Sequence, residues 1–182
     1  MLLKKQKVSK LILLRRNYLS NKPQIMFTQD TRKKYTLFIC KANVWRSQMA
    51  EGIYNHIHWK WMALSLAGCE ARKDTYAWKP AGSIQDFMIS YAWIDISNQK
   101  ICYLSDLSEN KISEIEKIIF LYDPTKEILC ESECMKNELS PYEYFRHRNI
   151  HIQIFPIPDP FEEWEMWYGP IYRSINSLIS SL

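Results

Sequence analysis

The sequence predicts an α/β protein with a three-layer αβα fold, in which helices cover both faces of a four-stranded parallel sheet. Three observations lead to this class. Short apolar runs rich in β-favouring residues alternate with segments of helical period through residues 35–182. The first of these runs enters a helical segment through a loop of only a few residues. The chain has 182 residues, which is the size of one ordinary domain.

The predicted strands are short, and they cover residues 35–39, 62–67, 117–122 and 149–155. The first strand has the sequence YTLFI and ends directly before Cys40, and its apolar character is typical of a buried strand. The third ends at Asp123–Pro124, and the fourth alternates apolar with polar side chains. Strands that alternate with helices in this way favour a parallel sheet.

Helical period begins at Ser47, after which six apolar side chains fall on one helix face: Met49, Ala50, Ile53, Tyr54, Ile57 and Trp61. Further helices are predicted over residues 83–93 and 107–115 and within 161–182. Ser108 is the predicted N-cap of the second of these. Gly169–Pro170 predicts a bend or an interruption in the last helix. The tryptophans, Trp93 among them, are expected to pack in the core or to anchor loops.

Residues 1–34 form a basic N-terminal extension, which we predict to be poorly ordered, and residues 35–182 form the folded domain. Of 24 basic and 20 acidic residues in the chain, the extension holds ten basic residues and the single acid Asp30. Such an arm can contact nucleic acid or an anionic membrane, and its composition also fits a mitochondrial-type targeting peptide. Met26 is a possible alternative start.

The apolar patch at residues 11–14 is too short for a secretory signal, and no stretch approaches the roughly 20 apolar residues of a membrane span. Five cysteines at irregular spacings indicate reduced thiols, so we expect a cytoplasmic location. Many of the tryptophans lie at helical spacings that are typical of packing, so we do not expect a nucleic-acid partner. The oligomeric state is left open.

Two chemically capable residues fall at one edge of the predicted sheet. Ligands of parallel α/β sheets bind outside the carboxyl ends of the strands. Cys40 follows the first strand. Asp159 follows the fourth, in a loop that Pro156, Pro158 and Pro160 keep extended. The active site is therefore predicted at this edge.

The loop after the first strand predicts a phosphate-binding site, and its residues are Cys40, Lys41, Ala42, Asn43, Val44, Trp45, Arg46 and Ser47. Because the loop ends where a helix begins, its backbone N–H groups and the helix dipole favour an oxyanion over residues 41–47. Arg46 can grip two oxygens at once with its planar fork. Cys40 is the predicted nucleophile, and Asp159 is the predicted general acid and then base. Asn43 and Ser47 are expected to hold the loop.

The stretch TLFICKANVWRSQMAEGIYNHI resembles the signature of the low-molecular-weight protein tyrosine phosphatases, which pair a C-x5-R-S loop with a late Asp-Pro loop. The phrase RSQMAEG at 46–52 is similar to the thioredoxin-coupled arsenate reductases of the same superfamily. The resemblance covers residues 35–182. It implies a phosphatase that hydrolyses phosphotyrosine or a similar aryl phosphate, on a phosphorylated protein or a small molecule, through a phosphocysteine and without a cofactor.

Four positions depart from the family pattern. Ala42 stands where members usually have Gly, and Trp45 where many have a second Cys. Leu66 and Asn98 stand where relatives often have Ser and His. These departures predict a loop backbone with less freedom and a thinner polar network behind it, and they leave a weakly active or silent enzyme open.

Two other functions remain open. The resemblance to arsenate reductases implies a relay of thiols placed just after the third strand, where this chain has Tyr122 and its next cysteines, Cys130 and Cys134, come later. A non-catalytic reader of phosphotyrosine or another anion would keep the loop, but it would need neither Cys40 nor Asp159.

The spacing C-x3-C-x12-H-x3-H, formed by Cys130, Cys134, His147 and His151, also fits a zinc site on numbers alone. Against zinc, Glu138 stands where a finger requires an aromatic core residue, and His151 falls in a predicted strand. No metal site is therefore predicted.

Overall fold

The computed structural model describes residues 35–58, 62–68, 82–126, 140–158 and 164–182. Within these ranges, four parallel strands form one sheet in the order β2-β1-β3-β4. The strands are β1 (Tyr35–Cys40), β2 (Ala63–Ala67), β3 (Ile115–Phe120) and β4 (His151–Ile154). The four-stranded parallel sheet predicted from the sequence is confirmed.

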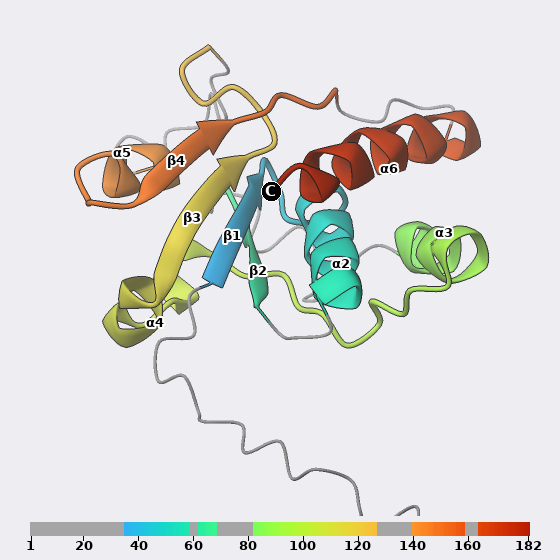
Figure 1. Cartoon of the computed structure of the whole chain (residues 1–182), viewed down its shortest axis with the longest axis horizontal. Coiled ribbons are helices and arrows are strands. Elements are labelled where there is room, and N and C mark those ends of the chain that lie inside the picture. The colour runs from blue at the N-terminus through green and yellow to red at the C-terminus, as the bar shows by residue number, and fades with distance from the viewer. Residues whose placement is uncertain (1–34, 59–61, 69–81, 127–139, 159–163) are drawn as a thin grey trace, which may run out of the picture. The chain divides into compact units, whose positions relative to one another are not determined.

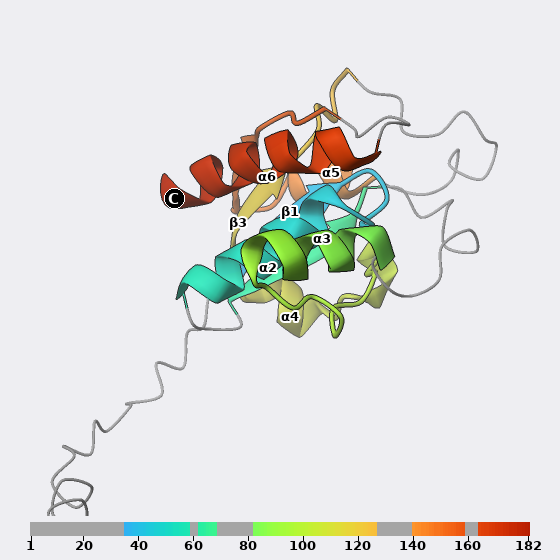
Figure 2. The same cartoon turned by 90° about the vertical axis from the view of Figure 1, so that its right-hand side faces the viewer.

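Helices cover both faces of this sheet (Figure 1). One face carries α2 (Arg46–His58), α3 (Gly82–Ala92) and α6 (Trp164–Ser180), which Figure 2 shows in front of the strands. The other face carries α4 (Glu109–Ser113) and α5 (Pro141–Phe145). A short 3-10 helix, η2 (Leu104–Asp106), precedes α4. The fold is thus three-layered as predicted, and no helix among the described residues has the length and apolar character needed to cross a bilayer.

Strand β1 supplies both halves of the core because its side chains point alternately to the two faces of the sheet. Phe38 and Cys40 face α2 and α6, where they join one buried cluster. Leu37 and Ile39 face the opposite side and join a second cluster with β3, α4 and α5. All four side chains are buried. The continuous apolar run seen in the sequence therefore reflects a central strand that is covered on both faces.

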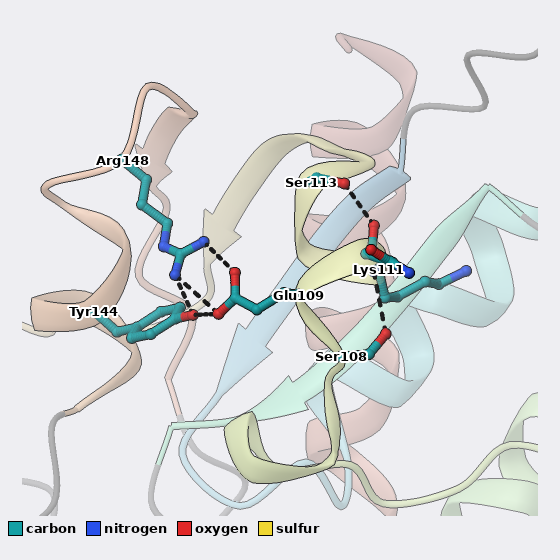
Figure 3. Close-up of polar contacts among 7 residues, drawn as sticks. Ser108, Glu109, Lys111, Ser113, Tyr144 and Arg148 are labelled. Atoms are coloured by element: carbon teal, nitrogen blue, oxygen red, sulfur yellow. Dashed lines mark hydrogen bonds and ion pairs between the residues drawn. The ribbon is translucent and has the colours of Figure 1, made fainter.

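Polar contacts join α4 to α5 and to the segment that follows α5 (Figure 3). Arg148 donates from both terminal nitrogens to the carboxylate of Glu109, at 3.0 and 3.1 Å, and Tyr144 donates to the same carboxylate at 2.7 Å. Ser108 caps α4, as predicted, by accepting from the Lys111 N–H at 3.3 Å. These contacts are solvent-exposed, so they fix the arrangement of the two segments more than they stabilise the fold.

Two predictions were wrong, namely an interruption of α6 and the packing of Trp93. Helix α6 is not interrupted, because it continues through Pro170, and buried apolar side chains line it on both sides of the proline: Tyr168, Ile171, Ile175, Leu178 and Ile179. Burial of this face compensates for the hydrogen bond that a proline removes. Trp93 does not pack, because its side chain is 86% exposed. It follows the last residue of α3 in a left-handed conformation with φ 59°, where the Ile94 N–H bonds back to the Met88 carbonyl.

Candidate active site

The loop between β1 and α2 lies at the carboxyl edge of the sheet. Strand β1 ends at Cys40 and α2 begins at Arg46, so only five residues join them. The Gly68 N–H at the end of β2 donates to the Cys40 carbonyl at 2.7 Å. On the other side, the Leu121 N–H beyond β3 donates to the Ile39 carbonyl at 2.7 Å. Both neighbouring strands therefore hold the base of the loop at the edge where parallel α/β sheets bind ligands.

The sulfur of Cys40 lies inside this loop and contacts the start of α2. Its Sγ is 3.0 Å from the Ser47 Oγ, and Asn43 Nδ2 donates to the same hydroxyl at 2.8 Å. Cys40 is 2% exposed, and Ser47 and Asn43 are fully buried. The first turn of α2 lies directly beyond the sulfur, so the positive end of the helix dipole favours negative charge there. The structure thus brings together the predicted nucleophile and the two residues predicted to hold the loop.

Asn43 provides the tight turn in the loop. Its φ is 55°, in the left-handed region, which Asn tolerates better than most non-glycine residues. Among the described residues that are not glycine, positive φ occurs only at Asn43 and Trp93. Ala42 therefore does not adopt the conformation that would favour glycine. The expectation that Ala42 restricts the loop has no support in the backbone angles.

Arg46 is buried at the first position of α2 and reaches across the carboxyl edge of the sheet. Its Nη1 donates to the Leu121 carbonyl at 3.1 Å and to the Ile157 carbonyl at 2.5 Å. These two carbonyls follow β3 and β4, so the guanidinium joins α2 to both of the segments that leave the sheet. A cation buried at a helix N-terminus strongly favours binding of an anion nearby.

The remaining loop residues differ in exposure. Val44 is buried against a small cluster formed by Ala67, Ile101 and Tyr103. Trp45 is partly buried and packs against this cluster and against the core on the α2 face. Lys41 and Ala42 are partly exposed. The Trp45 ring therefore has a packing role in this loop.

The polar network behind the loop is formed by residues other than the four that depart from the family pattern. Asn98, which stands where relatives often have His, is exposed. The Asn43 side chain instead accepts from Gln48 Nε2 at 2.9 Å and from the Cys102 N–H at 2.8 Å. Gln48 was missed by the sequence interpretation. Its position directly after Ser47, on the first turn of the predicted helix, was the signal that could have identified it.

Glu51 lies one turn further along α2 and is a second residue that the sequence interpretation missed. Its carboxylate accepts from the Ser65 hydroxyl of β2 at 2.5 Å. Burial of the carboxyl group raises its pKa to about 7, although the hydrogen bonds from Ser65 act in the opposite direction. The same burial effect, with the nearby charges of Glu51 and Asp106, raises the pKa of the Cys102 thiol.

Several predicted residues lie outside the described ranges. These are Asp159 and the cysteines Cys69, Cys130 and Cys134, together with the extension at 1–34. Two residues before Asp159, the Ile157 carbonyl accepts from Arg46 and its N–H donates to the Leu121 carbonyl at 3.2 Å. The chain therefore enters the Asp159 segment from a point that is anchored to the loop.

Both histidines of the zinc hypothesis are described and exposed. His147 accepts from Arg146 Nε at 3.1 Å, and His151 lies on β4 as the sequence predicted. No group of three or more acidic, His or Cys side chains within the described ranges is arranged to hold a metal ion. The two cysteines of that motif lie outside these ranges, so the motif as a whole stays untested.

Tyr122 occupies the position where a thiol relay would begin. It is fully buried and packs with Phe120 on the α5 face of the sheet, away from the core face to which Cys40 points. A Cβ atom placed on Gly68 would lie only 2.9 Å from the phenol Cζ. The space behind the end of β2 is therefore filled by the Tyr122 ring.

Comparison with known proteins identifies the fold. No model of a known protein family and no curated protein sequence matches the chain. Solved structures do match. The low-molecular-weight protein tyrosine phosphatase of T. tengcongensis aligns with a TM-score of 0.58 at 18% identity, over 81% of this chain and 95% of that one. Vibrio vulnificus Wzb, in complex with benzylphosphonate, aligns with a TM-score of 0.60 at 14% identity, over 81% and 95%.

An arsenate reductase from Archaeoglobus fulgidus aligns with a TM-score of 0.55 at 14% identity, over 80% of this chain and 96% of that one. These neighbours belong to the superfamily that the sequence resembles, so the predicted fold is confirmed. The chain has the fold shared by low-molecular-weight phosphatases and arsenate reductases, and it carries a buried cysteine and a buried arginine in the loop after the first strand of that fold.

Proposed function

We propose that this protein is a cysteine-dependent phosphatase that hydrolyses phosphotyrosine or a similar aryl phosphate. The observation that carries the proposal is the position of the Cys40 sulfur, 3.0 Å from the Ser47 hydroxyl at the start of α2. A hydroxyl donor and a helix N-terminus both stabilise a thiolate, which is the nucleophilic form of cysteine. The buried Arg46 at the same helix end supplies a fixed positive charge for the phosphoryl group.

In the first step, the Cys40 thiolate attacks phosphorus and the bond from phosphorus to the aryl oxygen breaks. The leaving phenolate oxygen takes a proton from Asp159, our candidate for the general acid. In the second step, water attacks the phosphocysteine, gives a proton to the Asp159 carboxylate, and breaks the phosphorus–sulfur bond. Phosphate leaves and the thiolate is restored.

The loop and Arg46 would stabilise the transferring group in both steps. Backbone N–H groups of residues 41–46 would bind the equatorial oxygens, and the Arg46 guanidinium would bind two of them. Two observations support this arrangement. Asn43 holds the turn of the loop in a left-handed conformation, and the Leu121 and Ile157 carbonyls orient the guanidinium.

Hydrolysis of p-nitrophenyl phosphate tests the proposal. We expect Cys40→Ser to lose turnover by at least about 10⁴-fold while it still binds phosphate, since a hydroxyl is a much weaker nucleophile. Cys102→Ser is the matched control, because Cys102 is a partly buried thiol outside the loop, and it should keep wild-type turnover. Equal turnover in Cys40→Ser and wild type would refute the proposal.

Asp159 has its own test within the same assay. We expect Asp159→Asn to slow substrates with poor leaving groups, such as phenyl phosphate, far more than p-nitrophenyl phosphate, because an activated phenolate leaves without a proton. A uniform loss across both substrates would remove Asp159 from the acid role and leave the Cys40 step intact.

Arsenate reduction is the second candidate, because arsenate has the geometry of phosphate and arsenate reductases share the fold. The buried Tyr122 is evidence against arsenate reduction, since a phenol occupies the position where the resolving thiol of a relay is expected. Thioredoxin-coupled reduction of arsenate, measured beside phosphatase turnover of the same preparation, separates the two. Phosphate binding without either activity would identify a non-catalytic anion reader.

A further inference from the structure

Behind the loop, a chain of hydrogen bonds has a direction that backbone groups determine. The Cys102 N–H donates to Asn43 Oδ1 at 2.8 Å. A backbone N–H can only donate, so the oxygen of the Asn43 amide must face Cys102. The Asn43 nitrogen then faces Ser47, where it donates to the hydroxyl at 2.8 Å. A contact with a backbone group 59 residues away is therefore one of the contacts that orient this amide.

Gln48 adds further hydrogen bonds to this series, and their donors and acceptors are fixed in the same way. Its Nε2 donates to the Lys100 carbonyl at 2.9 Å, and a carbonyl can only accept, so the Gln48 amide is also oriented. The second hydrogen of Nε2 goes to Asn43 Oδ1 at 2.9 Å. Gln99 completes the set, because the orientation that suits its neighbours places its amide nitrogen 2.7 Å from Gln48 Oε1. The fully buried Gln48 therefore has both its donors and its acceptor engaged.

The direction of these hydrogen bonds decides whether the hydroxyl of Ser47 or the thiol of Cys40 is the donor in the contact between them. The Ser47 Oγ accepts from Asn43 Nδ2, so its own single hydrogen is available to Cys40 Sγ at 3.0 Å. A hydroxyl that donates to sulfur stabilises the thiolate, whereas a hydroxyl that accepts from a thiol stabilises the neutral form. Gln48, Asn43 and Ser47 are fully buried, and hydrogen bonds between buried groups are strong and costly to leave unmade.

We propose that Gln48 is a positioning residue which, with the backbone of residues 100–102, orients Asn43 so that the Ser47 hydroxyl donates to the Cys40 sulfur and holds it as a thiolate. This inference deepens the proposed function, since it takes Cys40 as the nucleophile. Gln48 acts through Asn43 and Ser47, and it has no contact with the substrate in this scheme.

The test measures thiolate formation directly in the full chain. Iodoacetamide alkylates thiolates, and mass spectrometry of the peptide that contains Cys40 gives the alkylation rate of that cysteine as a function of pH. Gln48→Met keeps a similar length without hydrogen bonding. We expect the midpoint of the rate profile to move to higher pH by about one unit, the equivalent of one hydrogen bond to an ion. The charged neighbours Arg46 and Glu51 are unchanged in this variant.

The matched control is Asn55→Ala, on the same helix. Asn55 Oδ1 accepts from the N–H groups of Met62 and Ala63, each at 2.9 Å, so its loss should lower thermal stability without moving the profile. A midpoint in Gln48→Met equal to that of the wild type overturns the inference, and so does an equal shift in both variants. If Gln48→Met does not fold, Gln48→Glu takes its place, since an ionised carboxylate cannot donate to Asn43 and must also move the midpoint upward.

Activity gives a second readout and separates this inference from the proposed function. With p-nitrophenyl phosphate below the midpoint, we expect Gln48→Met to lower kcat by about tenfold with KM little changed, because less of the enzyme holds the thiolate. If the alkylation midpoint moves in Gln48→Met but the wild-type protein shows no phosphatase turnover, the proposed function fails and the role of Gln48 at the sulfur stands. If turnover is normal and the profile does not move, the inference alone fails.

Discussion

At the scale of single residues, burial rather than a neighbouring charge sets the protonation of Glu51. The carboxyl group lies between α2 and β2, where its pKa rises to about 7 from an ordinary value near 4.5. The folded state therefore binds a proton that the unfolded chain has already released between these two pH values. Folding is coupled to proton uptake in this range, so this group makes the free energy of unfolding decrease as pH rises.

This coupling predicts the behaviour of Glu51→Gln. The amide keeps an acceptor for the Ser65 hydroxyl but cannot ionise. We expect the variant to match wild type near pH 4.5 and to exceed it at pH 8 by about 3 kcal/mol, the upper value that the shift in pKa allows. Urea denaturation across this pH range measures the difference. A constant difference between the two proteins at every pH would show that Glu51 does not titrate in this range.

At the scale of elements, α2 approaches the turn after α3 closely at Gly52. A Cβ atom built on Gly52 would lie 2.6 Å from Cγ2 of Ile96, a fully enclosed side chain. Glycine in a helix costs about 1 kcal/mol relative to alanine. At this position the lower helix propensity of glycine is the cost of the close contact with Ile96. Because Gly52 has no side chain, residues 94–99 pack closely on α2, and Gln99 of that segment contacts Gln48.

Gly52→Ala is expected to lower the free energy of unfolding by about 1 kcal/mol, because overpacking outweighs the gain in helix propensity. In an Ile96→Ala background, the same substitution should become neutral or stabilising, since the clashing methyl group is absent. A double-mutant cycle by urea denaturation measures the coupling. Additive effects of the two substitutions would show that Gly52 and Ile96 do not constrain each other.

The sequence predicted those elements whose signals are local. The apolar run before Cys40 and the helical period after Ser47 located β1, α2 and the loop between them, because neighbouring residues carry that information. Helix α6 crosses Pro170 since tertiary packing outweighs the local cost. The exposure of Trp93 depends on how α3 ends, which periodicity does not report.

The candidate site divides in the same way. Cys40, Asn43, Arg46 and Ser47 are close in the chain, and the C-x5-R-S spacing alone predicted that they form one loop. The contacts that hold this loop come from residues distant in the sequence. Leu121 and Ile157 bind Arg46, and residues 100–102 bind Asn43 and Gln48. Such contacts between distant segments depend on strand order and register. A single sequence gives no direct signal for them.

At the scale of the whole molecule, Arg46 and the loop connect segments that leave three strands. Arg46 binds carbonyls beyond β3 and β4, and the base of the loop is bonded to the end of β2. An anion bound here would therefore stabilise the folded domain as one unit, by about 2.7 kcal/mol when its concentration is 100 times its dissociation constant. All of these contacts lie within residues 35–182, the range that we propose carries the function.

We therefore expect a chain that lacks residues 1–34 to keep the kcat/KM of the full chain for p-nitrophenyl phosphate and to show the same rise in Tm with added phosphate. The extension is rich in positive charge, so any contribution from it to anion binding would fall as salt rises. Both proteins should be measured at low and high salt, with Arg46→Ala in each as the control that loses the phosphate-induced rise. A truncated chain that folds but no longer responds to phosphate would place part of the anion site in the extension.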